Sequence, residues 1–409
     1  MRAVLVNHCH PDLPHVCAVR LREFARALAA RGHRIVLLTE TLTPDDAGTD
    51  AAGLAADLAA HDWAQPFRLA CPPVAAPSTR ALQLHRLRPP LSQAMVLWCY
   101  LVRGGVFWTW TAGSRPYWPV LAASFAPDVV WASFGNVDAL DIARGLAAAA
   151  RCPWVLDMKD PWNAFVPAPL CGLVARRYGN AAAVTALSEA HARAAAPWFG
   201  TDATVVYSGT EVRAPTPAPA AGDGTVRLVL TGSVYDGNDL ATLMDALRDW
   251  LAGRDRAVAD CVFIYAGGDH VRVLAAARAL DGLCRLDIHP WLAPDRLDAV
   301  QGTATANLYI KGRTTPFHHK LMELLAAGRP VICHPAESAE ARRIAGEVGV
   351  PLHSCADGAA LRAALASLAP PAGTPPPIAV DREALARYTW GTQAATLERV
   401  LHRAARDRT

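Results

Sequence analysis

The chain has 409 residues, 52% of them hydrophobic, and a formal net charge of only +3 at pH 7. This length predicts two domains of ordinary size, and scattered charge of this kind does not favour a nucleic-acid partner. Its 10 cysteines include no Cys-x-x-Cys pair, so they offer neither a zinc framework nor a thioredoxin-type motif and suit a reducing cytosol.

The first half of the chain alternates strand and helix signals. An apolar run at residues 2–8 predicts a strand, and it is followed by an amphipathic helix pattern at 18–33 and a second strand at 34–40. The N-terminal segment lacks the pattern of a signal peptide, so we expect a cytoplasmic protein. Further strands are predicted at 128–133, 154–158, 183–188 and 203–209. Their nearly continuous apolar character is typical of a parallel sheet that is buried on both faces.

An aromatic segment at residues 95–111 stands out within this half. It is interrupted by Arg103, Gly104 and Gly105, so it is too broken to span a membrane. Two alternatives stay open. The favoured one is a buried helical pair inside the first domain; the other is peripheral contact with lipid headgroups at the inner face of the cytoplasmic membrane.

A proline-rich and alanine-rich stretch at residues 213–224 is the predicted linker. It separates a first domain at 1–212 from a second α/β domain at 225–380, and a closing helix or helix pair follows at 381–409. Two doubly wound, Rossmann-like domains of this kind bind ligands in a cleft at the carboxyl ends of their strands. Neither domain carries Gly-x-Gly-x-x-Gly, a P-loop or a Gly-x-Ser-x-Gly elbow, which disfavours dinucleotide cofactors and serine hydrolases.

The second domain contains one helix with a suggestive pair of charges. Residues 316–327 are predicted to be helical, with Thr315 as the cap. Lys320 then lies in the first turns, where the helix already favours an anion, and Glu323 lies on nearly the same face. A carboxylate can accept two hydrogen bonds from a vicinal diol, so the pair suits the diphosphate and ribose of a nucleoside diphosphate. A plain surface ion pair is the alternative.

The segment PFHHKLMELLAAGRPVI, which contains this pair, resembles the donor-binding helix of GT-B glycosyltransferases, specifically the family 4-like group. Other motifs resemble that family in the same order: ALAARGHRIVLLT, PDVVWAS, WVLDMKDPW, VVYSGTEV, RLVLTGSVYDGNDLATLMDAL and RYTWGTQAATLERVL. The resemblance covers essentially the whole chain. It implies two Rossmann-like domains and a last helix that packs back on the first domain.

The resemblance implies a hexosyltransferase-like enzyme. The sugar would move from a nucleotide-diphosphate sugar to a glycan, lipid-linked or small-molecule acceptor, with retention and without a metal or other cofactor. The donor-binding residues implied are Lys320 for the diphosphate, Glu323 for the ribose, Gly232 and Ser233 for close backbone approach, and His289 and Trp291 beside the base. An epimerase of the same fold and a non-catalytic nucleotide-sugar-binding subunit remain alternatives.

Two departures from the family pattern affect the donor side. The glutamate that the family places eight positions before the ribose-binding one falls on Thr315 here. The arginine and lysine that often follow the first strand of the second domain are absent as well. Arg313 and Lys311, together with Lys320, are therefore expected to carry more of the phosphate charge.

Other candidates follow predicted strands or lie in loops. Asp160 is expected either to orient an acceptor hydroxyl or to cap a turn. His10 and His15 in the first loop are expected to contact the acceptor or share a proton, rather than to bind a metal. Arg20 is predicted to meet donor phosphate or to lie on a solvated helix face. His270 is a further donor-side candidate.

Overall fold

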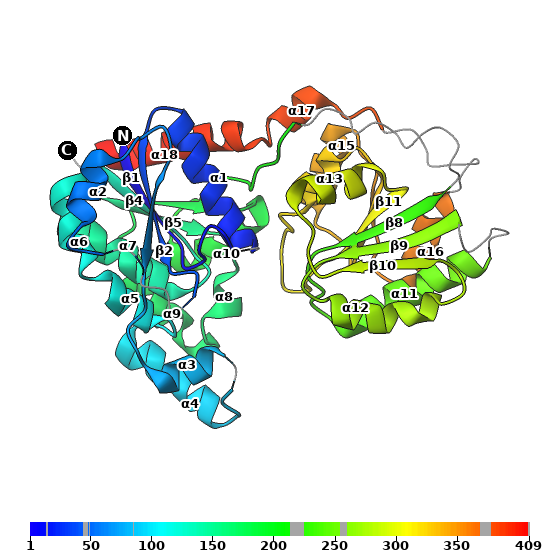
Figure 1. Ribbon diagram of the computed structural model, residues 1–409, viewed down its shortest axis with the longest axis horizontal. Coiled ribbons are helices and arrows are strands. Elements are labelled where there is room, and N and C mark those ends of the chain that lie inside the picture. The colour runs from blue at the N-terminus through cyan, green and yellow to red at the C-terminus, as the bar shows by residue number, and fades with distance from the viewer. Residues whose placement is uncertain are drawn as a thin grey trace. The chain divides into compact units, whose positions relative to one another are not determined.

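The computed structural model describes residues 1–13, 15–43, 48, 50–84, 86–212, 225–253, 260–368 and 378–407. It divides the chain into two compact units, Met1–Gly209 with Trp390–Thr409, and Thr210–Thr389. Each unit is a parallel sheet covered by helices (Figure 1), so the predicted α/β class with two doubly wound domains is confirmed. The predicted linker at 213–224 lies outside the described residues.

The first unit contains a seven-stranded sheet in the order β3-β2-β1-β4-β5-β6-β7. Its strands are β1 (Arg2–Val6), β2 (Arg34–Glu40), β3 (Phe67–Cys71), β4 (Val129–Ser133), β5 (Trp154–Met158), β6 (Ala183–Ala186) and β7 (Thr204–Val205). β4 and β5 are buried along their whole length, which explains their continuous apolar runs. The sequence pattern missed β3 because it is a short edge strand that exposes Arg68.

Helices cover both faces of this sheet. α1 (Val16–Ala30) and α18 (Trp390–Arg406) pack on one face, and α7 (Val137–Ala150) packs centrally on the other. The remaining helical segments of this unit are α2 (Leu54–Ala60), α3 (Pro77–Gln83), α4 (Leu91–Trp98), η1 (Cys99–Arg103), α5 (Trp108–Ser114), α6 (Tyr117–Val120), η2 (Leu121–Phe125), α8 (Trp162–Phe165), η3 (Ala168–Leu170), α9 (Cys171–Arg177) and α10 (Glu189–Phe199).

The second unit contains a six-stranded sheet in the order β10-β9-β8-β11-β12-β13. Its strands are β8 (Val226–Thr231), β9 (Cys261–Ala266), β10 (Arg285–His289), β11 (Ala306–Ile310), β12 (Val331–His334) and β13 (Leu352–Ser354). Its helices are α11 (Gly237–Ala252), α12 (His270–Ala277), η5 (Arg278–Leu280), α13 (Pro294–Gly302), α14 (Leu321–Ala326), α15 (Ala339–Val348), α16 (Gly358–Ser367) and α17 (Arg382–Ala386). In both units the strand order reverses beside the first strand, between β1 and β4 and between β8 and β11. Open α/β sheets bind ligands at such a point.

The closing segment divides between the two units, which corrects the prediction that all of 381–409 returns to the first domain. α17 stays with the second unit, where the Tyr388 hydroxyl donates to Glu347 Oε2 at 2.7 Å. α18 belongs to the first unit, where the Trp390 ring lies edge-on to Phe24 at 5.3 Å. The predicted return of the last helix is therefore correct from Trp390 onward.

The aromatic segment at 95–111 forms α4, η1 and the start of α5. In the part of the chain that the structure describes, no helix combines the length and apolar character needed to cross a membrane. The favoured prediction of a buried pair holds for α5, whose Trp110 is fully buried, but not for α4, which buries no residue completely. Exposed apolar side chains in α4 and η1 are Leu91, Leu97, Trp98, Leu101 and Val102.

Candidate functional site

The strand-order reversal of the second unit brings Lys320 to the end of β8. The Lys320 ammonium donates to the backbone oxygen of Thr231 at 2.6 Å. It occupies the space beside Gly232, where an added Cβ atom would lie 1.4 Å from Lys320 Nζ. Gly232 also has a φ of +89°, which disfavours other residues. The glycine therefore admits the ammonium to the point where this sheet is expected to bind a ligand.

The helix that follows Lys320, α14, is shorter than predicted. α14 begins at Leu321, so Thr315 does not cap it and Lys320 stands just before its first turn. Side-chain contacts hold the preceding residues as a loop: Lys311 Nζ donates to the Thr315 backbone oxygen at 3.3 Å, and His318 Nδ1 accepts from the Lys320 backbone N–H at 3.2 Å. Lys320 thus acts from a loop, and the predicted location in the first helical turns is wrong.

The environment of Lys320 makes its ammonium less stable than it is in water. Desolvation by burial lowers its pKa to about 8, although the nearby Glu323 carboxylate raises it. Burial, together with the charges of Lys320 and Lys311, also lowers the pKa of His318 to about 3. His318 is therefore neutral at pH 7, so the positive charge that an arriving anion would meet here comes from the two lysines.

The other predicted donor-side residues of the β11 loop have defined partners. The exposed Arg313 guanidinium forms an ion pair with the buried carboxylate of Asp239 on α11. Thr315 closes a turn by donating its N–H to the Gly312 backbone oxygen at 3.0 Å. Lys311 therefore adds positive charge to the loop that carries Lys320, whereas the charge of Arg313 is balanced by Asp239.

Glu323 and Ser233 are both exposed, Glu323 on the first turn of α14 and Ser233 after β8. Their exposure suits groups that meet a ligand. Two hydrogen bonds fix the loop that carries Ser233. The Tyr265 hydroxyl donates to the Gly232 oxygen at 2.7 Å, and the Val234 N–H donates to Asp269 Oδ2 at 2.9 Å. Sequence reasoning missed this support, since it comes from the neighbouring strand.

The remaining donor-side candidates lie farther along the sheet edge. His270 is the first residue of α12, after β9, and its buried Nδ1 has no hydrogen-bond partner among the described residues. His289 ends the edge strand β10 and pairs with Asp287 at 2.8 Å, while Trp291 is exposed. β10 is two strands from β8, a separation of about 10 Å. At this distance, the base of a nucleotide could lie beside β10 while its diphosphate lies at the end of β8.

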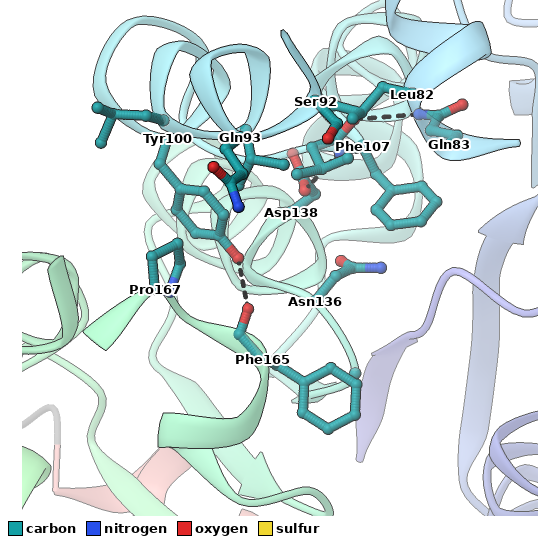
Figure 2. A pocket seen from close by; sticks show the side chains of 14 residues that line it. Leu82, Gln83, Ser92, Gln93, Tyr100, Phe107, Asn136, Asp138, Phe165 and Pro167 are labelled. Carbon is teal, nitrogen blue, oxygen red and sulfur yellow. Dashed lines mark hydrogen bonds between the residues drawn. The ribbon is translucent and has the colours of Figure 1, made fainter. Parts of the chain in front are cut away.

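In the first unit, a pocket of about 590 Å³ opens near the carboxyl end of β4 (Figure 2). Its walls are largely apolar, and its polar groups are few. The lining residues are Leu82, Gln83, Ser92, Gln93, Val96, Leu97, Tyr100, Val106, Phe107, Gly135, Asn136, Asp138, Phe165 and Pro167. The sequence analysis named none of these as site residues, because α3, α4 and the β4 loop meet only in the fold.

Two polar groups of this pocket are unusual. Asn136 caps α7 through Oδ1, which accepts from the Ala139 N–H at 3.0 Å, but its buried Nδ2 has no hydrogen-bond partner among the described residues. Burial raises the pKa of Asp138 to about 7, although the Phe107 N–H donates to its Oδ2 at 2.9 Å. An apolar cavity with a few aimed polar groups is the usual form of a ligand site.

Asp160 and His8 border the same region. A Cβ atom at Gly135 would lie 3.5 Å from His8 Cε1 and 3.7 Å from Asp160 Oδ2. Asp160 pairs with the buried Lys159 ammonium, and burial raises the pKa of its carboxyl despite that partner. Burial lowers the pKa of His8 to about 4, so its imidazole is neutral at pH 7. Asp160 therefore lies near a cavity, as a residue that orients an acceptor should, and His8 joins it.

The two other predicted histidines have separate surroundings. His10 Nδ1 accepts from the Asp12 N–H at 3.3 Å, within its own loop. His15 caps α1, and its Nδ1 accepts from the Cys17 N–H at 3.2 Å and lies 3.6 Å from the Cys9 sulfur. His15 thus belongs to a group with two cysteines, which sequence reasoning did not foresee.

Both predictions for Arg20, contact with donor phosphate and a place on a solvated helix face, are wrong. Its guanidinium is buried and donates to both carboxylate oxygens of Asp157, at 2.9 and 3.1 Å. It also donates to Ser208 Oγ and the Val206 oxygen. Arg20 ties α1 to β5 and the segment after β7, so its role is structural.

The chain matches no protein-family model and no curated protein. Its structure, in contrast, resembles many solved structures, and the class that these define is the GT-B fold of two Rossmann-like domains.

Three solved structures illustrate the likeness. Sucrose-phosphate synthase from Thermosynechococcus elongatus has a TM-score of 0.66 and 16% identity, with 98% of each chain covered. HepE of Anabaena, in complex with UDP and glucose, has a TM-score of 0.57 and 14% identity, covering 100% of this chain and 98% of that one. A Listeria monocytogenes protein provisionally assigned as a UDP-N-acetylglucosamine 2-epimerase has a TM-score of 0.58 and 13% identity, with coverage of 100% and 98%. Identities this low show the fold alone.

Proposed function

We propose that this protein is a glycosyltransferase, similar to the family 4-like group, that uses a nucleoside-diphosphate sugar. The observation that carries the proposal is the Lys320 ammonium beside Gly232, at the strand-order reversal of the second unit. This arrangement supports diphosphate binding there, with the exposed Glu323 holding the ribose and Ser233 approaching the phosphates. HepE binds UDP and UDP-glucose on a similar fold, which favours a uridine nucleotide as the first ligand to test.

The chemistry requires stabilisation of a leaving diphosphate. The bond between the anomeric carbon and the phosphate oxygen breaks, a bond to the acceptor oxygen forms, and the hydroxyl proton leaves the acceptor. Lys320, Lys311 and Arg313 would face the negative charge that develops on the diphosphate, in place of the arginine and lysine that are absent after β8. We propose that these three cations allow transfer without a metal ion at the diphosphate.

The first unit is proposed to hold the acceptor. Its apolar pocket supports an acceptor with an apolar portion, and this favours a lipid-linked acceptor over a free glycan. The unpartnered Asn136 amide would donate to an acceptor oxygen, and Asp160 or His8 would orient the attacking hydroxyl and take its proton. His10 lies in the same loop as His8 and is proposed as an outer acceptor contact.

Peripheral membrane contact fits the same proposal. α4 lines the pocket and exposes Leu97 and Trp98, while η1 exposes Leu101 and Val102. The Arg103 guanidinium lies over the rings of Trp98 and Trp108, at 5.3 and 4.5 Å. Aromatic and basic side chains together suit a lipid headgroup boundary, so we propose that this segment delivers the protein to the cytoplasmic face of a membrane.

The direct test is nucleotide binding by calorimetry, with UDP, GDP and their sugars against the wild-type protein, Lys320→Ala and Glu323→Gln. We expect one nucleotide series to bind and both variants to weaken it. Arg248→Ala is the matched control, since Arg248 is an exposed cation of the same unit that pairs with Asp245 and Asp249. If no nucleotide binds, or if the control weakens binding as much as the variants do, the proposal fails.

An epimerase is the second candidate, because one structural neighbour is assigned that activity. An epimerase converts a nucleotide sugar without any acceptor and needs groups that move protons at a sugar carbon. Incubation of the protein with nucleotide sugars alone, followed by NMR of the sugar ring, separates the two. An inverted ring carbon without acceptor would favour the epimerase, and transfer that requires an added acceptor would favour the transferase.

A further inference from the structure

Cys9, His15 and Cys17 come together at the carboxyl end of β1. Their ligand atoms all lie within 4.8 Å of one another, and the Cys9 sulfur lies 3.6 Å from His15 Nδ1. Cys9 is 6% exposed and Cys17 is 4% exposed, whereas His15 is at the surface. The group therefore combines two buried sulfurs with an imidazole that solvent reaches.

These separations fit a tetrahedral zinc site. With Zn–S near 2.3 Å and Zn–N near 2.0 Å, tetrahedral angles place a sulfur about 3.5 Å from a nitrogen and about 3.8 Å from a second sulfur. The distance of 3.6 Å between the Cys9 sulfur and His15 Nδ1 is close to the sulfur–nitrogen value. The two sulfurs lie within 4.8 Å of each other, a range that contains the sulfur–sulfur value. Metal binding would require small side-chain movements and the loss of the hydrogen bond that His15 Nδ1 accepts from the Cys17 N–H.

The backbone prepares the ligand atom of His15. Because the Cys17 N–H donates to Nδ1 at 3.2 Å, this nitrogen carries a lone pair and the proton resides on Nε2. The same bond fixes the imidazole at the start of α1, over the two sulfurs. This tautomer leaves Nδ1 able to bind a metal, but the metal would have to take the lone pair from the Cys17 N–H, since an imidazole nitrogen has only one.

We propose that Cys9, His15 and Cys17 bind a zinc ion that fixes the β1–α1 loop. Two thiol protons leave to solvent as the metal binds. Three protein ligands leave one tetrahedral position for water. The Lys159 ammonium, which is paired with Asp160, also interacts with Cys17 and His15, so the two thiolates would have to offset its repulsion of the metal. No metal was predicted from the sequence, because the first-loop histidines were considered without Cys9 and Cys17.

The test uses the full chain without an affinity tag, purified in the absence of chelators. We expect about one zinc per chain by mass spectrometry of elements, and a thiolate-to-cobalt charge-transfer band when Co²⁺ replaces zinc under anaerobic conditions. Cys9→Ser and Cys17→Ser should each weaken cobalt binding by at least about tenfold. Cys152→Ser is the matched control, because Cys152 is only partly buried and lies in the same unit.

Two further measurements keep the test decisive. His15→Ala changes a surface side chain, so it should fold even where the cysteine variants do not, and it should also weaken the cobalt band. Circular dichroism checks folding in every case. Absence of zinc and of the band in the wild-type protein would overturn the proposal. So would a band that persists in His15→Ala, or a disulfide between Cys9 and Cys17 in freshly purified protein.

Discussion

Replacement of Gly232 by alanine should weaken nucleotide binding without any change in a charged residue. The new methyl group would overlap the Lys320 ammonium, since the added Cβ atom falls 1.4 Å from Nζ. Lys320 must then leave its place at the end of β8. A charge-assisted hydrogen bond to phosphate is worth about 1.5–3 kcal/mol, so we expect UDP affinity to fall by about 10- to 100-fold.

The backbone contributes separately to this variant. At a φ of +89°, alanine costs about 1–2 kcal/mol of stability whatever its neighbours. Gly282 provides the matched control, because its φ is +78° and an added Cβ atom there meets nothing within 4 Å. Gly282→Ala should lower the free energy of unfolding by a similar amount and leave UDP affinity unchanged.

A double-mutant cycle with Lys320→Ala completes the test, with calorimetry for UDP affinity and urea unfolding for stability. If Gly232→Ala acts by displacing the ammonium, the double variant should bind no more weakly than Lys320→Ala alone. Additive losses would show that Gly232 acts on the ligand independently of Lys320. Unchanged affinity in Gly232→Ala would refute the reasoning altogether.

Three further predictions concern stability, followed by urea unfolding. The pKa of Lys320 is lowered from 10.5 to about 8, so the free energy of unfolding of the wild-type protein should rise between pH 8 and pH 10.5. Lys320→Met should remove this rise and increase the free energy of unfolding by up to about 3 kcal/mol at pH 7. The pKa of Asp138 is raised from 3.8 to about 7, so the free energy of unfolding should fall by up to about 4 kcal/mol as pH rises from 4 to 7. Asp138→Asn should remove this fall. Arg20→Met should cost about 3–5 kcal/mol, because it leaves the buried Asp157 carboxylate uncompensated; a loss below 1 kcal/mol would contradict that role.

The strands of both sheets were largely predictable, because buried parallel strands are continuous apolar runs. In the second unit each strand coincides with an apolar run of the sequence, at 226–232, 261–268, 284–290, 305–311, 330–335 and 350–354. In the first unit only the exposed edge strand β3 was missed. The helix at Lys320 was predicted too long because Pro316 after Thr315 resembles a helix start. The contacts of Lys311 and His318 hold that segment as a loop instead.

The candidate sites were less predictable, for a physical reason. Lys320 was found from local spacing, but Gly232, beside which it lies, follows β8 and is 88 positions earlier in the chain, and only the sheet order brings them together. The pocket of the first unit and the Cys9, His15 and Cys17 group likewise depend on how loops meet after folding. Arg20 was misplaced because a charged residue on an amphipathic helix is usually solvated, and its buried partner was not visible in the sequence.

Lys320 links these observations to function. Its lowered pKa means that the folded protein disfavours the charged amine, so burial of this charge is a net cost to stability despite the hydrogen bond to Thr231. A group that costs stability at a strand-order reversal is better explained by binding than by folding. An arriving diphosphate would offset the desolvation cost and raise the pKa again, so nucleotide binding above pH 8 should take up a proton. Calorimetry in buffers of different ionisation enthalpy would detect that proton. Binding without proton uptake at pH 9 would show that Lys320 does not contact the diphosphate.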